Sequence, residues 1–259
     1  MRVVAAEMPA SFEPEALKAQ TVAARTYTLS KMERTVEAHP DADVCTDITC
    51  CQAYIDPADA AANWGENAQT YTDKIAAAVA DTDGMAALFQ GQPIQAVFFS
   101  SAAGRTVDAV EVWGNAVPYL TSVDSPEGTR CPTTTPPSQC PGRVQKQAAG
   151  PVPAGRSVRR AGGLVCQPCP QFRRRGGDGG HRRRHRGRWK PAYLFGLRST
   201  SFTVSASADG VTFSVTGYGH GVGMSQYGAN ALAKEGKSYD EILKWYYTGI
   251  DVAPYTPQR

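Results

Sequence analysis

The sequence predicts a mixed α/β fold of the α+β class, in which helices pack on small sheets. Apolar residues recur at helical spacing over 11–37, whereas they alternate on both sides of an Asp-Gly pair within 201–217. The chain has 259 residues, enough for one large domain or two small ones. Helix and strand patterns thus occur in different parts of one chain.

The first elements are expected within residues 3–40. We interpret the apolar run 3–6 as the end of a buried strand, closed by Glu7-Met8-Pro9. Ser11 suits the N-cap of a helix that reaches about residue 37, before His39-Pro40 ends it. The apolar face of this helix consists of Val22, Leu29, Met32 and Val36.

Further elements follow on both sides of the middle of the chain. We expect a helix over 68–88, a buried strand over 95–101 and a short strand over 117–122. A hairpin over 201–217 then turns at Asp209-Gly210.

The last part of the chain contains a glycine run and two helix patterns. Glycines alternate from Gly217 to Gly223, and we expect them to let the backbone approach an extended ligand closely. The run lacks the spacing of a dinucleotide or phosphate loop. Helices are expected over 226–234 and 239–247, the second starting with a capping box at Ser238.

The middle of the chain has a different composition from its flanks. Residues 129–192 contain 15 basic residues and one acidic residue, whereas the rest contains 12 basic and 23 acidic residues. Such a block lacks the apolar area needed for a packed core. We therefore divide the chain into 1–128, an anomalous Arg/Gly/Pro-rich segment 129–192, and 193–259.

Glu7 is the first candidate for chemistry. A carboxylate that follows an apolar run and precedes a proline is partly desolvated, which raises its pKa and suits a general acid at neutral pH. The alternative is an ordinary surface glutamate near the start of a helix.

A second candidate is a cluster of possible metal ligands. The pattern H-x5-C-x4-C-C supplies four nitrogen or sulfur ligands, which is the number that a tetrahedral zinc needs. The alternative is a disulfide between Cys45 and either Cys50 or Cys51. The four residues are His39, Cys45, Cys50 and Cys51.

Many short strings resemble the SpoIID/LytB family, which contains lytic transglycosylases that act on peptidoglycan. They lie in family order on both flanks, and this order makes the resemblance specific. The matching strings are 7–9, 15–20, 23–27, 51–54, 98–101, 104–106, 111–114, 118–120, 197–200 and 217–229.

The resemblance implies a SpoIID-type domain with a substrate cleft and Glu7 as its catalytic acid. A lytic transglycosylase needs only one carboxylate, because the C6 hydroxyl of the sugar is the nucleophile and leaves a 1,6-anhydromuramic end. His220, Ser225 and Gln226 then become candidates to bind the glycan. Further candidates, with helix packing as the alternative for the first two, are Arg25, Tyr27, Ser100 and Ser101.

The resemblance also bears on the metal and on the basic block. Some members of the family hold a zinc ion with histidine and cysteine ligands from the loop that matches 39–51. The likeness stops after Glu127 and returns at Leu194. We interpret the block as a frame-shifted stretch of a GC-rich gene, because shifted codons there yield mostly Arg, Gly, Pro and Ala. The alternatives are a solvated insertion and an arm that binds nucleic acid.

The family suggests an extracytoplasmic or cell-wall location. We expect peptidoglycan glycan strands as the partner, and an amidase if the chain is a non-catalytic, LytB-like enhancer instead; nucleic acid is not expected. No apolar run reaches the roughly 18 residues of a membrane span. The run before Glu7 is too short for a signal peptide, and we expect further sequence upstream of Met1.

Overall fold

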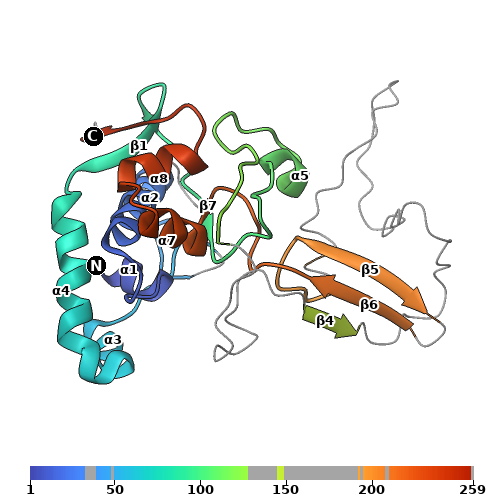
Figure 1. The fold of residues 1–259 in the computed structure, drawn as a ribbon. Helices are drawn as coiled ribbons and strands as arrows, with labels where there is room; N and C mark the ends of the chain where they lie inside the picture. The colour runs from blue at the N-terminus through green and yellow to red at the C-terminus, as the bar shows by residue number, and fades with distance from the viewer. Residues whose placement is uncertain are drawn as a thin grey trace.

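The computed structural model has a mostly helical body and a separate three-stranded sheet (Figure 1). It describes residues 1–32, 39–47, 50–127, 145–148, 192, 195–207 and 210–257. The mixed α/β prediction is confirmed. Most of the basic block, and hence its frame-shift interpretation, lies outside the described residues.

The first element is a helix, so the predicted strand over 3–6 is wrong. Helix α1 spans Arg2–Glu7 and buries Val4. A four-residue apolar run does not distinguish strand from helix, and two alanines favour the helix. Met8 is extended (φ −124°, ψ 138°), the conformation that a following proline imposes, and this places Glu7 at the end of α1.

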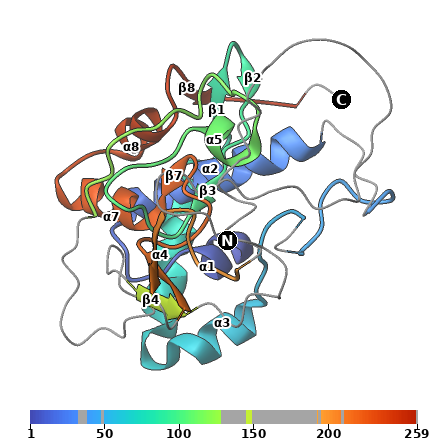
Figure 2. The same cartoon turned by 90° about the vertical axis from the view of Figure 1, so that its right-hand side faces the viewer.

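Helix α2, Pro14–Met32, is the centre of the body (Figure 2). It contacts α1, α4, α7, α8 and β1, so it is buried on several sides rather than along one stripe. Val22 of the predicted apolar face is fully buried, whereas Met32 is exposed. Small residues at Ala16, Ala19 and Ala23 let the neighbouring helices approach closely.

Helix α3 (Pro57–Trp64), the short 3₁₀ helix η1 (Gly65–Asn67) and α4 (Ala68–Asp81) follow. The predicted helix over 68–88 is too long, because Gly84 adopts φ +69° and the chain continues as strand β1, Met85–Phe89. Strand β1 lies between β2 (Gln92–Pro93) and β8 (Asp251–Pro254), antiparallel to both.

A two-stranded parallel sheet joins the two flanks. Strand β3 (Phe98–Phe99) pairs with β7 (Met224–Ser225), so only part of the predicted strand 95–101 forms. Helix α5 spans Ala109–Trp113. The predicted strand 117–122 is absent from the described residues, where the chain is irregular next to an isolated Arg105–Asp124 bridge.

The C-terminal predictions are largely confirmed. The hairpin consists of β5 (Phe202–Ser207) and β6 (Gly210–Val215), with β4 (Gln145–Ala148) on the other edge of β6. Helices α7 (Gln226–Lys234) and α8 (Tyr239–Tyr246) form as expected, and Ser238 and Glu241 make the predicted capping box.

The main core draws on both flanks. Leu17 and Val22 of α2 pack in one cluster with Met224, Leu243 and Tyr246. The hairpin has a small core of its own, in which Phe213 and Val215 pack against Leu197. Within the described part of the chain, no helix is long and apolar enough to cross a membrane.

Candidate active site and metal centre

Glu7 stands at the C-terminal end of α1, against the segment that follows the cysteine loop. Its Oε1 accepts a hydrogen bond of 2.7 Å from the backbone N–H of Ala53. Partial burial raises the pKa of this carboxyl, and the Ala53 bond offsets only part of the increase. Among the described residues the carboxylate makes no ion pair. A carboxyl that is partly desolvated, fixed and without a cation suits proton donation.

Gln226 secures the backbone next to this carboxyl. Its Nε2 donates to the carbonyl oxygen of Glu7 at 2.9 Å and lies 3.5 Å from Oε1 of Gln20. Both glutamine side chains are buried. The structure thus brings Glu7 and Gln226 together from opposite ends of the sequence.

Ser225 binds a partly buried carboxylate, that of Glu127, which no sequence pattern indicated. The Ser225 hydroxyl donates to Oε1 of Glu127 at 2.5 Å, and the same oxygen accepts from the N–H of Ala102 at 2.5 Å. Ser225 also caps α7 by accepting from the N–H of Gly228. Oε2 of Glu127 is buried without a hydrogen-bond partner. Ser225 therefore serves as a structural junction, and its predicted contact with the glycan stays a prediction.

The alternating glycines pack against the chain's own segment 97–107. A Cβ at Gly219 would lie 2.8 Å from Cβ of Phe99, and one at Gly223 would lie 2.2 Å from the carbonyl oxygen of Val97. These glycines thus approach the segment 97–107 closely, and their predicted approach to an extended ligand stays a prediction. The glycines hold the backbone that carries Ser225 and Gln226 in place.

His220 has both ring nitrogens occupied by backbone groups. Nδ1 accepts from the N–H of Val222 at 3.1 Å, so the proton resides on Nε2, which donates to the carbonyl of Phe98 at 3.0 Å. The imidazole contacts the rings of Phe99 and Trp113 at centroid distances of 5.6 and 5.4 Å, tilted by 51° and 48°. Burial lowers the pKa of His220 to about 4. This neutral ring ties the glycine loop to β3, and glycan binding by it stays a prediction.

Three other predicted residues bind or contact other parts of this chain. The Arg25 guanidinium donates to the carbonyl oxygens of Thr82 (2.6 Å) and Met85 (3.0 Å), which joins α2 to the start of β1. Lys31 lies over the ring of Tyr27, 5.4 Å from its centroid. Ser101 is buried and exchanges two backbone hydrogen bonds with Tyr218.

Ser100 is also bound within the fold: its backbone carbonyl oxygen accepts a hydrogen bond from the N–H of Tyr227 at 3.0 Å. None of these interactions connects Arg25, Tyr27, Ser100 or Ser101 to Glu7. Their predicted role in glycan binding is untested.

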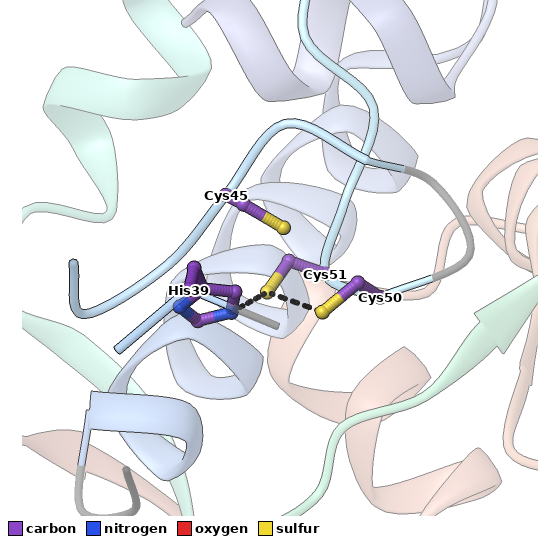
Figure 3. Close-up of side chains that lie close together, drawn as sticks. All are labelled: His39, Cys45, Cys50 and Cys51. Carbon is purple, nitrogen blue, oxygen red and sulfur yellow. Dashed lines mark hydrogen bonds between the residues drawn. The ribbon is translucent and has the colours of Figure 1, made fainter. Parts of the chain in front are cut away.

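The four predicted metal ligands form a cluster (Figure 3). The ligand atoms of His39, Cys45, Cys50 and Cys51 all lie within 4.8 Å of one another. Nε2 of His39 is 3.4 Å from Sγ of Cys51, which is 3.9 Å from Sγ of Cys50. The three cysteines are free, without a disulfide among them.

The His39–Cys51 and Cys51–Cys50 separations match two edges of a zinc coordination tetrahedron. With Zn–S of about 2.3 Å and Zn–N of about 2.05 Å, tetrahedral geometry separates N from S by about 3.6 Å and S from S by about 3.8 Å. Nδ1 of His39 donates to the carbonyl of Ala42 at 2.7 Å, which leaves the lone pair of Nε2 free for a metal. The residues therefore fit a zinc ion.

Comparison with known proteins gives consistent matches. Residues 1–89 match the family described as Stage II sporulation protein, SpoIID. The Stage II sporulation protein D of Bacillus subtilis (strain 168) is 39% identical over 261 residues, covering 97% of this chain and 72% of that protein. That of Bacillus amyloliquefaciens is 37% identical over 257 residues, with the same coverage. The Amidase enhancer of B. subtilis (strain 168) is 29% identical over 302 residues, 98% of this chain and 40% of that protein.

Proposed function

Because the chain belongs to the SpoIID family, we propose that it is a lytic transglycosylase acting on the cell wall. Its reaction cleaves the bond between N-acetylmuramic acid and N-acetylglucosamine in peptidoglycan. The observation that carries this proposal is Glu7: a carboxyl with a raised pKa, held by the N–H of Ala53 and without an ion-pair partner in the described part of the chain.

One carboxyl suffices for the proposed reaction. Glu7 donates its proton to the glycosidic oxygen while the bond from that oxygen to C1 of the muramic residue breaks. The leaving sugar departs with a free hydroxyl. The Glu7 carboxylate then takes the proton of the C6 hydroxyl as O6 bonds to C1, which closes the 1,6-anhydro ring and returns Glu7 to its protonated state. The nucleophile belongs to the same sugar, so proximity replaces a second carboxylate.

The test compares Glu7→Gln with the unchanged chain on purified glycan strands. We expect anhydro ends to appear with the unchanged chain and to fall at least about 100-fold with Glu7→Gln, because general acid catalysis contributes about 10²–10⁴-fold. Glu66→Gln, an exposed glutamate on η1, is the matched control and should retain full activity. Anhydro ends that persist with Glu7→Gln would contradict the assignment of Glu7 as the catalytic acid.

A second candidate function rests on the likeness to the Amidase enhancer. In that case the chain binds the cell wall and stimulates a separate amidase without cutting glycan. Release of anhydro ends by the purified chain alone contradicts this candidate, whereas stimulation of an amidase by both the unchanged chain and Glu7→Gln supports it. Either function implies an extracytoplasmic location.

We also propose that His39, Cys45, Cys50 and Cys51 hold one structural zinc ion. A zinc ion bound by these four residues would cross-link them and so stabilise the chain that leads to Ala53, whose N–H binds Glu7. Metal analysis of protein purified without chelator should find about one zinc per chain. A metal-free, folded protein with a disulfide between two of these cysteines would contradict the proposal.

A further inference from the structure

Two residues near Glu7 form an exposed pair that the proposed reaction does not use. They are Arg2, the first residue of α1, and Tyr54, which directly follows Ala53, the residue whose N–H binds the Glu7 carboxyl. The hydroxyl of Tyr54 accepts a hydrogen bond from Nη1 of Arg2, and the guanidinium carbon lies 5.6 Å from the centre of the ring. This bond holds the guanidinium at the hydroxyl end of the ring.

The pair and Glu7 lie along the same short helix. Ala53 contacts Glu7 at the C-terminal end of α1 and Tyr54 contacts Arg2 at the N-terminal end, so the segment 53–54 runs beside α1 in the opposite direction. Arg2 and Glu7 stand at the two ends of this six-residue helix, about 7.5 Å apart along its axis. Neighbouring sugars of one glycan strand bridge such a distance, so a sugar at Tyr54 is close in the strand to the bond at Glu7.

The side chain of Tyr54 is accessible although its position is fixed. Tyr54 is 43% exposed, and it is held by its bond to Arg2 and by its attachment to Ala53. An aromatic ring that is fixed in advance loses little side-chain entropy when it binds a ligand. The C–H groups on one side of a pyranose ring form an apolar surface, and an exposed tyrosine offers an apolar ring to such a surface. The chemistry of Tyr54 therefore matches a sugar.

Arg2 adds a positive charge without a carboxylate partner. It is exposed, and within the described residues it makes no ion pair. The carboxylate of Asp56, two residues after Tyr54, accepts instead from the N–H of Ala58 and caps α3. The bond to Tyr54 uses one of the five N–H donors of the guanidinium and leaves the others to a ligand. A guanidinium binds a carboxylate with paired, charge-assisted hydrogen bonds.

A sugar that carries a carboxylate matches both groups. The muramic residue of peptidoglycan is such a sugar, because its lactyl group ends in a carboxylate and a peptide attached there carries carboxylates of its own. We propose that Tyr54 and Arg2 form a subsite for a muramic residue, in which the sugar stacks on the ring of Tyr54 and its carboxylate arm pairs with Arg2. The inference rests on the proposed function for the identity of the glycan strand, and it makes the charge of the strand part of its recognition.

The first experiment measures how much the carboxylate contributes to binding. The protein is the full chain carrying Glu7→Gln, so that the strand is not cut during calorimetry. The probe is a tetrasaccharide of alternating N-acetylglucosamine and N-acetylmuramic acid, compared with its neutral methyl ester. We expect the acid to bind about fivefold more tightly than the ester at low salt, and Arg2→Gln to abolish this preference while leaving the affinity for the ester unchanged. Lys244→Gln, which removes an exposed positive charge on α8, is the matched control and should keep the preference.

A second probe identifies the source of the charge. It is the same tetrasaccharide with stem peptides attached, again compared with its methyl ester. A preference for the peptide-free acid alone assigns the pairing to the lactyl carboxylate, whereas a preference for the peptide-bearing acid assigns it to the peptide. Both results support the proposal if Arg2→Gln abolishes the preference. A preference that survives Arg2→Gln, or no preference for either acid, overturns it.

The second experiment tests the ring of Tyr54 with the neutral ester. Tyr54→Ala, added to Glu7→Gln, should weaken binding of the ester about tenfold, whereas Tyr54→Phe keeps the ring and should change it less than about twofold. Trp245→Ala, at an aromatic residue on α8 with the same exposed fraction of 43%, is the control and should change nothing. Binding that Tyr54→Ala leaves unchanged, in a variant that retains its circular dichroism spectrum and Tm, also overturns the proposal.

The outcomes separate this inference from the proposed function. Preferential binding of the acid through Arg2, with no anhydro ends released by the unchanged chain, refutes the reaction and keeps the subsite. Release of anhydro ends by the unchanged chain, together with binding that neither Arg2→Gln nor Tyr54→Ala alters, keeps the reaction and refutes the subsite.

Discussion

Replacing Gly223 by alanine tests the close packing of the glycine loop against the segment 97–107. Gly223 adopts φ +75°, and a Cβ there would lie 2.2 Å from the carbonyl oxygen of Val97 and 3.2 Å from the ring of Tyr247. That oxygen accepts two hydrogen bonds, from the N–H of Met224 (3.2 Å) and from the hydroxyl of Tyr247 (2.9 Å). The backbone must move to admit the methyl group, and both bonds move with it.

The expected loss in the free energy of unfolding is estimated by comparing Gly223 with Gly236, a second glycine at positive φ. Gly236 adopts φ +89° with nothing within 4 Å of its Cβ position, so Gly236→Ala incurs only the conformational strain, about 1–2 kcal/mol. Gly223→Ala adds about 1–3 kcal/mol for overpacking and about 0.5–1.5 kcal/mol for a weakened hydrogen bond. The difference between the two variants should be about 3 kcal/mol in the free energy of unfolding.

Thermal unfolding monitored by circular dichroism measures this difference. For a chain of this size, 3 kcal/mol corresponds to about 6–12 °C in Tm. Gly223→Ala should therefore melt at least about 6 °C below Gly236→Ala. Equal losses in the two variants would refute the reasoning, because they would show that strain at positive φ, rather than contact with Val97, explains the glycine.

Four further predictions concern single groups. Glu7→Gln should raise Tm at pH 7, because the raised pKa means that the partly buried carboxylate destabilises the fold there. This gain should vanish as the pH falls through the raised pKa to the ordinary 4.5, and a gain that grows toward low pH would contradict the reasoning. Glu127→Ala should lower the free energy of unfolding by about 1–3 kcal/mol in urea titrations, since Ala102 and Ser225 lose their acceptor, whereas Asp124→Ala, at an exposed ion pair, should lower it by less than about 1 kcal/mol. The ring protons of His220 should show no titration between pH 5 and 8 by NMR, because its pKa is about 4; a midpoint near 6.5 would contradict the buried, doubly bonded ring. Chelation of zinc should lower Tm and reduce glycan cleavage together, and an unchanged Tm in metal-free protein would argue against a structural metal.

Local patterns explain which elements the sequence predicts well. The capping box at Ser238 and the pairing of the two hairpin strands depend on residues that are close in the sequence, and both form. The predicted helix over 68–88 is longer than the observed one, because the chain turns at Gly84 and continues as β1. The apolar pattern continues across this glycine and does not mark the boundary. The apolar run 3–6 is too short to show a period, so its sequence does not distinguish a strand from the helix that forms.

The site depends on contacts between residues that are distant in the sequence. Residue types and spacing identify His39 and the three cysteines as possible ligands. Local sequence makes Glu7 a candidate acid, and the resemblance implies its catalytic role. The role of Glu127 is not predictable from the sequence, because its partner Ser225 is 98 residues away and no local pattern marks a partly buried carboxylate. The two backbone partners of His220 become visible only when the loop folds on β3, so no local pattern predicts that this ring joins the loop to the strand.

The pairing of β1 with β8 has a consequence for biosynthesis. Strand β8 follows β1 by more than 150 residues in the sequence, so the sheet that holds β1 is completed only when residues 251–254 have left the ribosome. One edge of β1 therefore lacks its partner strand while the intervening residues are synthesised. Loop-closure entropy grows only as the logarithm of loop length, so doubling the intervening stretch would add only about 0.6 kcal/mol. The two flanks can therefore be joined by stretches of quite different length without losing their common core.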